Sequence, residues 1–393
     1  MNFDVLELSG VVVAFLVALL LVVVVHPQVA KFAIKRNVVD NPDFRKLQRT
    51  PVPVMGGVAV FFGLVAGLGV ASFFLDITTI LPMFLAISIM LCVGVADDVS
   101  DLSPWLRFGI EIAMTLMMIY ITDMSLDSFH GLWGYYDMPV WLSVPLTVVS
   151  VVGIINATNL IDGVDGLSSG FCIMASIIFG VLFFMVGRLE MCLLCMLTIG
   201  ALMPFFFHNV FGVKSKMFIG DGGSLMMGVV MSSYVVAAID SGSDCGKLVQ
   251  NCGTGLVPFT LAVMCVPVFD TLRVMTMRLL RKTSPFHPDK THLHHLFIEL
   301  GFSHVGTTLS VLMLNLIVVM AWYLAFSLGA SIDTQFYVVV GCGFGVTAVF
   351  YKFMRIQINR HSAISRAARN LGGRTHVADR RGWQLLQKLA DHR

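Results

Sequence analysis

Charged residues are scarce in this sequence: Asp, Glu, Lys and Arg together make up 13% of its 393 residues, about half of the ~25% found in soluble domains. Hydrophobic residues reach 57%. A chain with so few charges cannot cover a water-facing surface, which excludes a soluble protein. The apolar runs recur along the whole chain, which also excludes a soluble enzyme with one anchor. The composition therefore predicts an integral membrane protein.

Apolar stretches long enough to cross a bilayer, which takes roughly 20 residues, occur eleven times. They lie near residues 10–26, 54–75, 77–96, 105–122, 140–156, 167–187, 190–208, 222–240, 255–275, 308–329 and 335–353. We expect an all-α polytopic bundle of about eleven transmembrane helices. We expect residues 1–355 to form one polytopic membrane domain and residues 356–393 to form a basic cytoplasmic tail near anionic lipid.

Basic residues are nearly absent from one of the two sets of alternating loops. The other set consists of 27–53, 97–107, 208–221, 273–307 and the tail from 352, and it contains 24 of the 26 Lys and Arg residues. Because cytoplasmic loops carry the excess of Lys and Arg, this set is predicted to face the cytoplasm. The amino terminus is therefore expected outside and the carboxyl terminus inside.

The eight cysteines form no pattern typical of a disulfide framework. Six fall within predicted spans, where Cys packs as a small hydrophobe. Cys245 and Cys252 lie in the predicted outer loop 241–254, and the sequence leaves open whether they form a disulfide.

Ionisable residues are few in the middle of the predicted spans, where a transporter would be expected to carry them. Polar residues gather instead in four clusters, all on the predicted cytoplasmic side. This arrangement favours an active site open to the cytosol. A membrane transporter and an intramembrane Mg²⁺-dependent prenyltransferase are the alternatives, although the second would typically show another Asp-rich motif.

The first two clusters are rich in carboxylate and amide side chains. Asp97 and Asp101 lie one helical turn apart, with Asp98 beside Asp97, so two carboxylates can bind one divalent cation or one of them can act as a base. The plain alternative is that these residues cap the next helix. The second cluster contains Asn156, Asn159, Asp162 and Asp165. Its two Asp-Gly steps form turns, and its side chains can bind a polar ligand or a cation.

The other two clusters combine glycines or histidines with charge. The segment FIGDGGS begins at Phe218 and opens a predicted span, so its backbone N–H groups can approach a phosphate while Asp221 holds Mg²⁺ or caps the helix. The fourth cluster is a basic loop that contains Arg281, His292, His294 and His295. Without nearby thiols these histidines favour anion binding or proton transfer over zinc, and a solvated loop is the plain alternative.

In their order and spacing, the four clusters resemble the cytoplasmic motifs of the polyprenyl-phosphate N-acetylhexosamine-1-phosphate transferases. The matching segments are the Asp97–Asp98 pair, NATNLIDGVDGL, FIGDGGS and SPFHPDKTHLHH. The last segment is similar to that of the undecaprenyl-phosphate N-acetylglucosamine-1-phosphate transferase branch. The first inner loop keeps the family's Arg45, Lys46, Gly56 and Gly57 but has Gln48 and Val54 where the family has His and Arg.

The resemblance implies transfer of N-acetylhexosamine 1-phosphate, with GlcNAc-1-phosphate favoured, from a UDP-sugar to undecaprenyl phosphate, with release of UMP. It implies catalytic roles for Asp97, Asp98, His292, His294 and His295, and Mg²⁺, for which Mn²⁺ can substitute, on Asp221 with Asp97 and Asp98. By the resemblance, Asp97 or Asp98 either deprotonates the lipid phosphate or attacks the UDP-sugar itself. The lipid phosphate needs little help from a base at neutral pH, so we favour its direct attack. The implied substrate-binding residues are Arg45, Lys46, Asn156, Asn159, Asp162, Asp165, Phe218 and Arg281.

The partners implied by the resemblance are a UDP-N-acetylhexosamine, undecaprenyl phosphate and the lipid bilayer, without nucleic acid. The implied location is the bacterial cytoplasmic (inner) membrane, with the active site on its cytoplasmic face and a product used in cell-envelope polysaccharide synthesis. The sequence leaves open the exact sugar, the polymer made from it and the oligomeric state, a homodimer included.

Overall fold

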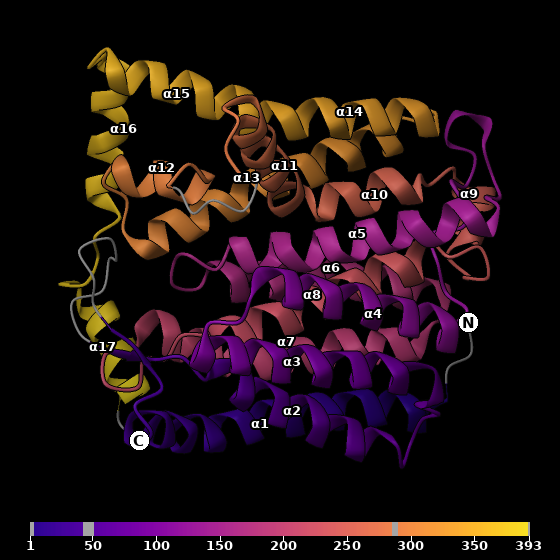
Figure 1. The fold of residues 1–393 in the computed structure, drawn as a ribbon, viewed down its shortest axis with the longest axis horizontal. Helices are drawn as coiled ribbons and strands as arrows, with labels where there is room; N and C mark the ends of the chain where they lie inside the picture. Colours follow the sequence, from indigo (N-terminus) through magenta and orange to yellow (C-terminus); the bar gives the residue numbers. More distant parts are fainter. Residues whose placement is uncertain (1–3, 42–50, 285–289, 392–393) are drawn as a thin grey trace.

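The computed structural model describes residues 4–41, 51–284 and 290–391, and most of its helices run side by side in one direction (Figure 1). The first eight are α1 (Val5–Lys35), α2 (Gly56–Ala71), α3 (Leu81–Ser100), α4 (Pro104–Thr122), α5 (Val140–Leu160), α6 (Leu167–Val186), α7 (Leu189–Phe211) and α8 (Gly220–Ile239). The others are α9 (Gly246–Cys252), α10 (Leu256–Val263), α11 (Cys265–Leu280), α12 (Leu293–Glu299), α13 (His304–Ser327), α14 (Ile332–Phe344), α15 (Phe350–Asn359), α16 (Ala363–Arg374) and α17 (Arg381–Asp391). The short strands β1 (Val39–Asp40) and β2 (Val52–Pro53) pair antiparallel, with Val39 opposite Pro53.

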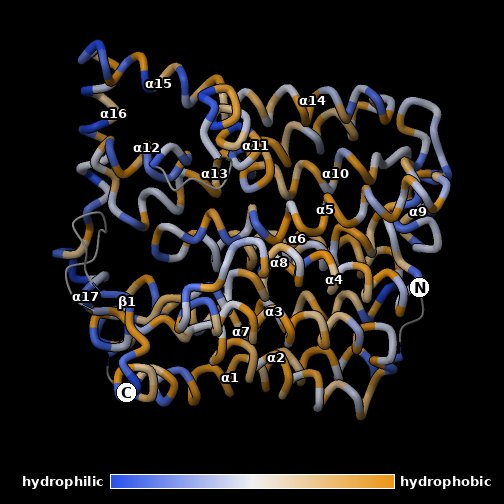
Figure 2. The backbone as a smooth tube through the Cα atoms, in the orientation of Figure 1, coloured by the Kyte–Doolittle hydropathy of each residue, from blue (hydrophilic) through white to orange (hydrophobic). Residues whose placement is uncertain are grey.

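The predicted all-α membrane fold is confirmed. Within the described residues nine helices are long and apolar enough to cross a membrane, and the bent pair α10–α11 makes up to ten. The predicted span 54–75 appears as α2, whose 16 residues reach about 24 Å and fall short of the ~30 Å hydrocarbon core. Hydrophobic residues occupy the middle of the bundle, and hydrophilic ones gather at the end with α15, α16 and α17 (Figure 2).

The predicted span 255–275 is not one straight helix, because the chain bends by 77° between α10 and α11. Pro267 lies in the first turn of α11 and has no N–H group to continue the helical ladder. The fully buried Asn315 of α13 supplies the missing partners: its side chain accepts a hydrogen bond from the N–H of Val266 (2.9 Å) and donates one to the carbonyl of Val263 (2.9 Å). A broken helix at membrane depth is tolerated when its backbone groups are satisfied in this way.

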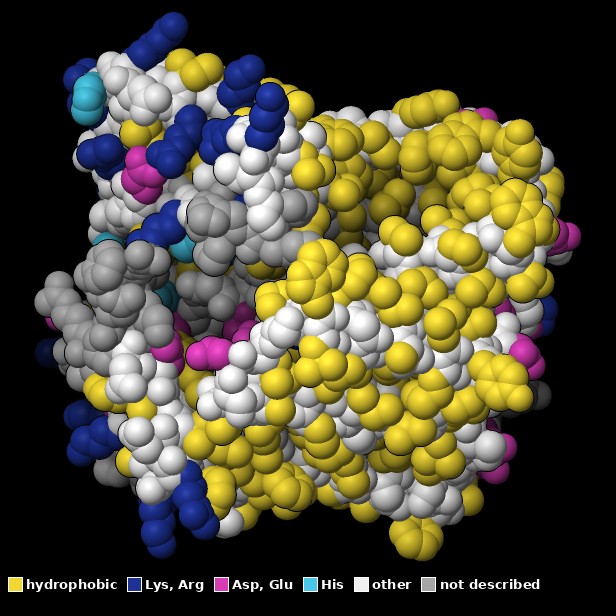
Figure 3. Space-filling model, viewed as in Figure 1, with side chains coloured by type: hydrophobic (Ala, Val, Ile, Leu, Met, Phe, Trp, Pro, Cys, Tyr) yellow, Lys and Arg dark blue, Asp and Glu magenta, His cyan; other side chains and the backbone are white. Residues whose placement is uncertain are grey.

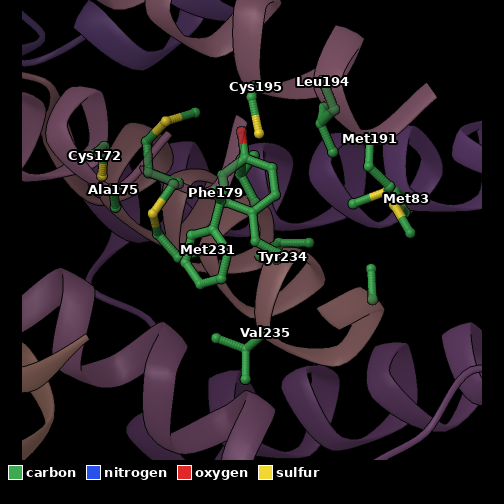
Figure 4. Packing of buried hydrophobic residues seen from close by; sticks show 14 of the residues in the cluster. Met83, Cys172, Ala175, Phe179, Met191, Leu194, Cys195, Met231, Tyr234 and Val235 are labelled. Carbon is green, nitrogen blue, oxygen red and sulfur yellow. The ribbon is translucent and has the colours of Figure 1, made fainter. Parts of the chain in front are cut away.

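Helix α8 forms the centre of the bundle, because 94% of the residues in its most apolar stretch are buried. Tyr234 lies fully buried against Phe179, Met231 and Cys195 (Figure 4). Its hydroxyl donates to Thr198 Oγ1 at 3.0 Å, because a buried phenol requires a polar partner. The packing fixes α8 along its length and so fixes its amino-terminal end, where Asp221 lies.

The two ends of the bundle differ in charge. On the face shown in Figure 3, Lys and Arg side chains gather at the end with α15 and α16, and Asp and Glu side chains lie along the opposite end. The chain begins and ends at opposite ends of the bundle (Figure 1). Cys245 and Cys252 of the predicted outer loop are free thiols, the first buried and the second exposed.

The orientation in the membrane stays a prediction. A reporter fused after Arg393 is expected to be cytoplasmic, and a reporter inserted in the 241–254 loop is expected to be external, because the basic loops face the cytoplasm. Paired phosphatase and fluorescent-protein fusions measure both positions. The opposite pattern would place the four clusters away from cytosolic nucleotides.

Candidate active site

A cavity of about 740 Å³ lies between the end of α3, the start of α8, the loop 161–166 and the start of α13. The predicted residues that line it are Asp97, Asp98, Asp162, Asp165, Phe218, Asp221 and His295. Figure 3 shows a hollow at the same end of the molecule, with acidic and His side chains in its walls. All four clusters found in the sequence therefore contribute to one cavity.

Glycines set how closely the helices approach at this cavity. A Cβ atom added to Gly94 of α3 would lie 2.4 Å from the carbonyl carbon and oxygen of Asp221, and one added to Gly57 of α2 would lie 2.3 Å from Cα of Gly223. Gly220, with φ +73°, is in the left-handed region that favours glycine. The glycines of FIGDGGS thus allow α8 to pack against α2 and α3 and so determine the position of Asp221.

The amino-terminal N–H groups of α8 bind a protein carboxylate. The N–H groups of Asp221 and Gly222 donate to the two oxygens of Asp98, at 3.0 and 3.2 Å. The sequence predicted that N–H groups of this segment approach a phosphate, whereas in the structure these two cap the helix with Asp98. A carboxylate at a helix amino terminus is stabilised by the N–H donors and by the helix dipole.

A chain of ionic and amide contacts connects α3, α4 and α5. Arg107 Nη1 of α4 lies 2.9 Å from Asp97 Oδ2, and Arg107 also lies beside the buried Glu111, at 3.8 Å. The amide of Asn156 donates to Glu111 at 2.6 Å, so this predicted substrate-binding residue contacts α4. Asn159, one turn later, donates to Asp221 Oδ1 and to Ser224 Oγ, both at 2.8 Å. Arg107 belongs to none of the four clusters, and its only signal in the sequence is its place ten residues after Asp97.

The loop 161–166 brings a second group of charges to the cavity. Asp165 Oδ2 lies 2.6 Å from Lys216 Nζ and 2.7 Å from His304 Nδ1. Burial raises the pKa of Asp165, but the hydrogen bond and charge of His304, and then Lys216, lower it below its usual value. Asp165 is therefore ionised and paired, while Asp162 is exposed to the cavity. His304 lines the cavity and was missed in the sequence, because the short helix α12 separates it from the His cluster.

Comparison of the sequence with known proteins identifies the family of this chain. The sequence profile of a family described as "Glycosyl transferase family 4" matches residues 80–239. A probable undecaprenyl-phosphate N-acetylglucosaminyl 1-phosphate transferase of Bacillus subtilis (strain 168) is 33% identical over 309 residues, which cover 78% of this chain and 82% of that protein. The chain belongs to glycosyl transferase family 4.

Two further relatives bear the same kind of name. The undecaprenyl-phosphate alpha-N-acetylglucosaminyl 1-phosphate transferase of Escherichia coli (strain K12) is 28% identical over 302 residues, which cover 75% of this chain and 79% of that protein. The protein of the same name from Yersinia pestis is 29% identical over 281 residues, covering 70% of this chain and 73% of the relative. The family predicted from the four motifs is confirmed.

The His cluster of this family 4 protein divides into one cavity residue and two buried ones. His295 lines the cavity, whereas His292 and His294 are 4% and 3% exposed. His292 Nδ1 lies 3.0 Å from Oδ2 of the buried Asp270 of α11, which also pairs with Arg273 at 2.7 Å. Asp270 therefore fixes the start of α12, an arrangement for which the sequence offered no signal beyond an Asp within a span.

His294 packs against the loop 161–166, where its Nε2 would lie 2.5 Å from a Cβ atom on Gly163. Burial lowers the pKa of His294 to about 3, assisted by the neighbouring His295 and His292. His294 is therefore neutral in this buried environment. The predicted catalytic roles of His292 and His294 stay predictions, and their contacts indicate that they hold the start of α12, which presents His295.

We expect His295→Ala to affect turnover and His292→Ala to affect the stability of this transferase. His295→Ala should lower turnover about 10²-fold or more if the ring contacts a reacting group, without changing thermal stability. His292→Ala should lower the unfolding free energy by about 1–3 kcal/mol, because it removes a buried hydrogen bond to Asp270. Turnover assays and thermal unfolding of the purified protein measure the two effects, and metal analysis should find no stoichiometric zinc. One zinc per chain, or equal loss of stability in both variants, would contradict this division.

The remaining predicted substrate-binding residues have different environments. Phe218 lines the cavity, and its ring lies 5.6 Å from Lys216 Nζ. Its backbone pairs with the first inner loop, because its N–H donates to the carbonyl of Pro53 at 2.8 Å. Arg281 directly follows α11 and is exposed. Arg45 and Lys46 lie outside the described residues.

The donor atoms at the cavity fit the predicted magnesium ion. Asp98 accepts a hydrogen bond from the backbone N–H of Asp221, and Asp97, Asp98 and Asp221 all line the same cavity. Mg²⁺ takes one or two carboxylates and completes its shell with phosphate oxygens and water. Among the residues that the structure describes, no group of three or more His, Cys, Asp or Glu side chains is arranged around a metal position. The site thus suits a cation that arrives with a phosphate substrate.

Proposed function

We propose that this family 4 protein transfers GlcNAc 1-phosphate from UDP-GlcNAc to undecaprenyl phosphate, with release of UMP, at the cytoplasmic face of a bacterial inner membrane. The observation that carries the proposal is the convergence of four separate polar clusters on one cavity, in a chain whose relatives are named for this transfer. The product is a lipid-linked diphosphate sugar, the form in which a cell-envelope polysaccharide can be assembled on a membrane.

The proposed reaction is a direct displacement at phosphorus. An oxygen of the lipid phosphate attacks the phosphorus that carries the sugar, the bond from that phosphorus to the bridging oxygen breaks, and the electron pair leaves with UMP. The two predicted catalytic carboxylates already have partners, since Asp97 pairs with Arg107 and Asp98 caps α8. They are therefore poorly placed to act as nucleophiles, which supports direct attack by the lipid phosphate.

The protein's contribution is to align two anionic substrates and to balance their charge. Mg²⁺ held by Asp221 with Asp97 or Asp98, or Mn²⁺ in its place, would neutralise charge on the diphosphate. Asn159 fixes the orientation of Asp221, and Lys216 and His295 face the same cavity. Asp162 and Phe218 bind the nucleotide in this proposal, and the ring of Phe218 stacks on the uracil ring.

The experiment that tests the function is turnover by the purified protein. We would incubate it with undecaprenyl phosphate and a panel of UDP-sugars and measure UMP and the lipid product together. UMP release with UDP-GlcNAc and undecaprenyl phosphate, and with neither alone, is the expected result. Uptake of a solute into proteoliposomes without UMP release would favour a transporter, and transfer of a prenyl group would favour a prenyltransferase.

Phe218→Ala is expected to weaken binding of the UDP-sugar and of UMP by about 5- to 150-fold, because base stacking on an aromatic ring contributes roughly 1–3 kcal/mol. The affinity for undecaprenyl phosphate should hardly change, and Phe218→Trp should retain much of the nucleotide affinity. Inhibition by UMP measures the effect directly. A less stable alanine variant with unchanged UMP inhibition would indicate that the ring only packs and that uridine binds elsewhere.

A further inference from the structure

The carboxyl-terminal helix α17 contacts the loop 213–218, which carries Lys216 and Phe218 into the cavity. Helix α17 packs against the end of α7, where the ring of Trp383 lies 4.7 Å from that of Phe211. Asp391, in the last described turn of the helix, contacts the loop itself. In Figure 1, α17 lies at the end of the bundle where the site opens, beside the end of α7.

Asp391 is bound by an array of donors from three successive residues. Its Oδ1 atom accepts hydrogen bonds from the N–H groups of Val213, Lys214 and Ser215, each at 3.0 Å, and from the hydroxyl of Ser215 at 3.1 Å. Successive N–H groups that point to one centre form a nest for an anion. The hydrogen bonds lower the pKa of Asp391 although its partial burial acts in the opposite direction.

The position of this carboxylate within its helix is unfavourable by itself. The carboxyl-terminal end of a helix carries partial negative charge, so an Asp in the last turn is repelled by the helix dipole. The N–H groups of Val213, Lys214 and Ser215 act against this repulsion, because they donate to the carboxylate. The partners of Asp391 are therefore in the loop and not in α17.

Two buried histidines also bind the loop, so Ser215 has hydrogen-bond partners in α1 and α7 as well as in α17. His26 Nε2 of α1 lies 2.9 Å from the carbonyl oxygen of Ser215, and His208 Nδ1 of α7 lies 3.1 Å from its hydroxyl. The next residue, Lys216, pairs with Asp165 in the cavity and lies over the Phe218 ring. A displacement of Ser215 would therefore move the residues that contact the substrate.

We propose that Asp391 is a positioning residue: through the nest at 213–215 it makes the carboxyl-terminal helix part of the scaffold that holds Lys216 and Phe218 at the nucleotide end of the cavity. The statement about the nucleotide rests on the proposed function. The ordering of the loop by Asp391 does not, and it can be measured without any substrate.

The test compares Asp391→Ala with Asp379→Ala in the full-length protein, because Asp379 is an exposed carboxylate in the turn before α17. Hydrogen exchange at 213–218 should become about 10- to 150-fold faster in Asp391→Ala, the factor expected for loss of hydrogen bonds to a charged group. Asp379→Ala should leave it unchanged. Asp391→Asn, which keeps an acceptor oxygen without the charge, should lie between them, and Trp383→Ala should resemble Asp391→Ala because it loosens α17.

The kinetic part separates positioning from general destabilisation. Asp391→Ala should raise the KM for UDP-GlcNAc about 5-fold or more, as loss of an aligned stacking ring would, with the KM for undecaprenyl phosphate and kcat nearly unchanged. Equal exchange in the two alanine variants would overturn the proposal, and so would faster exchange with an unchanged KM for UDP-GlcNAc. If the wild-type protein released no UMP from any UDP-sugar, the proposed function would fail, and exchange alone would decide whether Asp391 orders the loop.

Discussion

Asp221→Asn is expected to reduce UMP release by about 10²- to 10³-fold or more, the range found when a group that stabilises developing charge is removed. Asp221 lines the cavity at the start of α8, and the replacement keeps its shape and the oxygen that accepts from Asn159. The change removes the negative charge that would hold Mg²⁺ against the diphosphate. The variant should therefore insert and purify like the wild type while losing turnover.

A control variant and a chelator experiment test whether the loss of turnover in Asp221→Asn comes from the loss of Mg²⁺. Asp244→Asn in the loop 241–254 is the matched control, because Asp244 is exposed and the change removes the same charge far from the cavity, and its turnover should be unchanged. An excess of chelator should abolish wild-type turnover, and added Mg²⁺ or Mn²⁺ should restore it. Full turnover in chelator would sink the magnesium proposal, whatever the variant does.

Gly94→Ala should damage both the fold and the site. Its Cβ would lie 2.4 Å from the backbone of Asp221, and backbone atoms in a packed helix crossing cannot rotate away as a flexible side chain can. Overpacking of this kind costs about 1–3 kcal/mol. A shift of Asp221 by about 1 Å would lower turnover roughly 10²-fold. Thermal unfolding and UMP release, measured on the same preparation, should therefore fall together.

Gly109→Ala in α4 is the control, because it makes the same change from glycine to alanine, with the same gain in helix propensity, at a position without close neighbours. A Cβ atom at Gly109 would meet nothing within 4 Å, so alanine there should be neutral or slightly stabilising. If Gly94→Ala behaved like Gly109→Ala, the close approach of α3 to α8 would not determine the position of Asp221. Loss of stability with full turnover would likewise separate the helix packing from the site.

The sequence by itself determined the class of the molecule and most of its helices, since these depend on properties of neighbouring residues. Length and hydrophobicity of a run decide whether it can cross a bilayer, and the four clusters were recognisable because their members lie within a few residues of one another. The family followed from the same local motifs. The break between α10 and α11 was not local, because it depends on Asn315, some fifty residues later, to satisfy the freed backbone groups.

Only the tertiary structure decided which side chains meet and which partners they take. His292, His294 and His295 are near neighbours in the sequence, yet one lines the cavity and two are buried, because Asp270 and Gly163 approach them from distant segments. The N–H groups that open α8 took Asp98 as their acceptor, although a phosphate suited the motif equally well. A carboxylate, an amide or an imidazole has a fixed chemistry but many possible partners, and the approach of remote backbone selects among them.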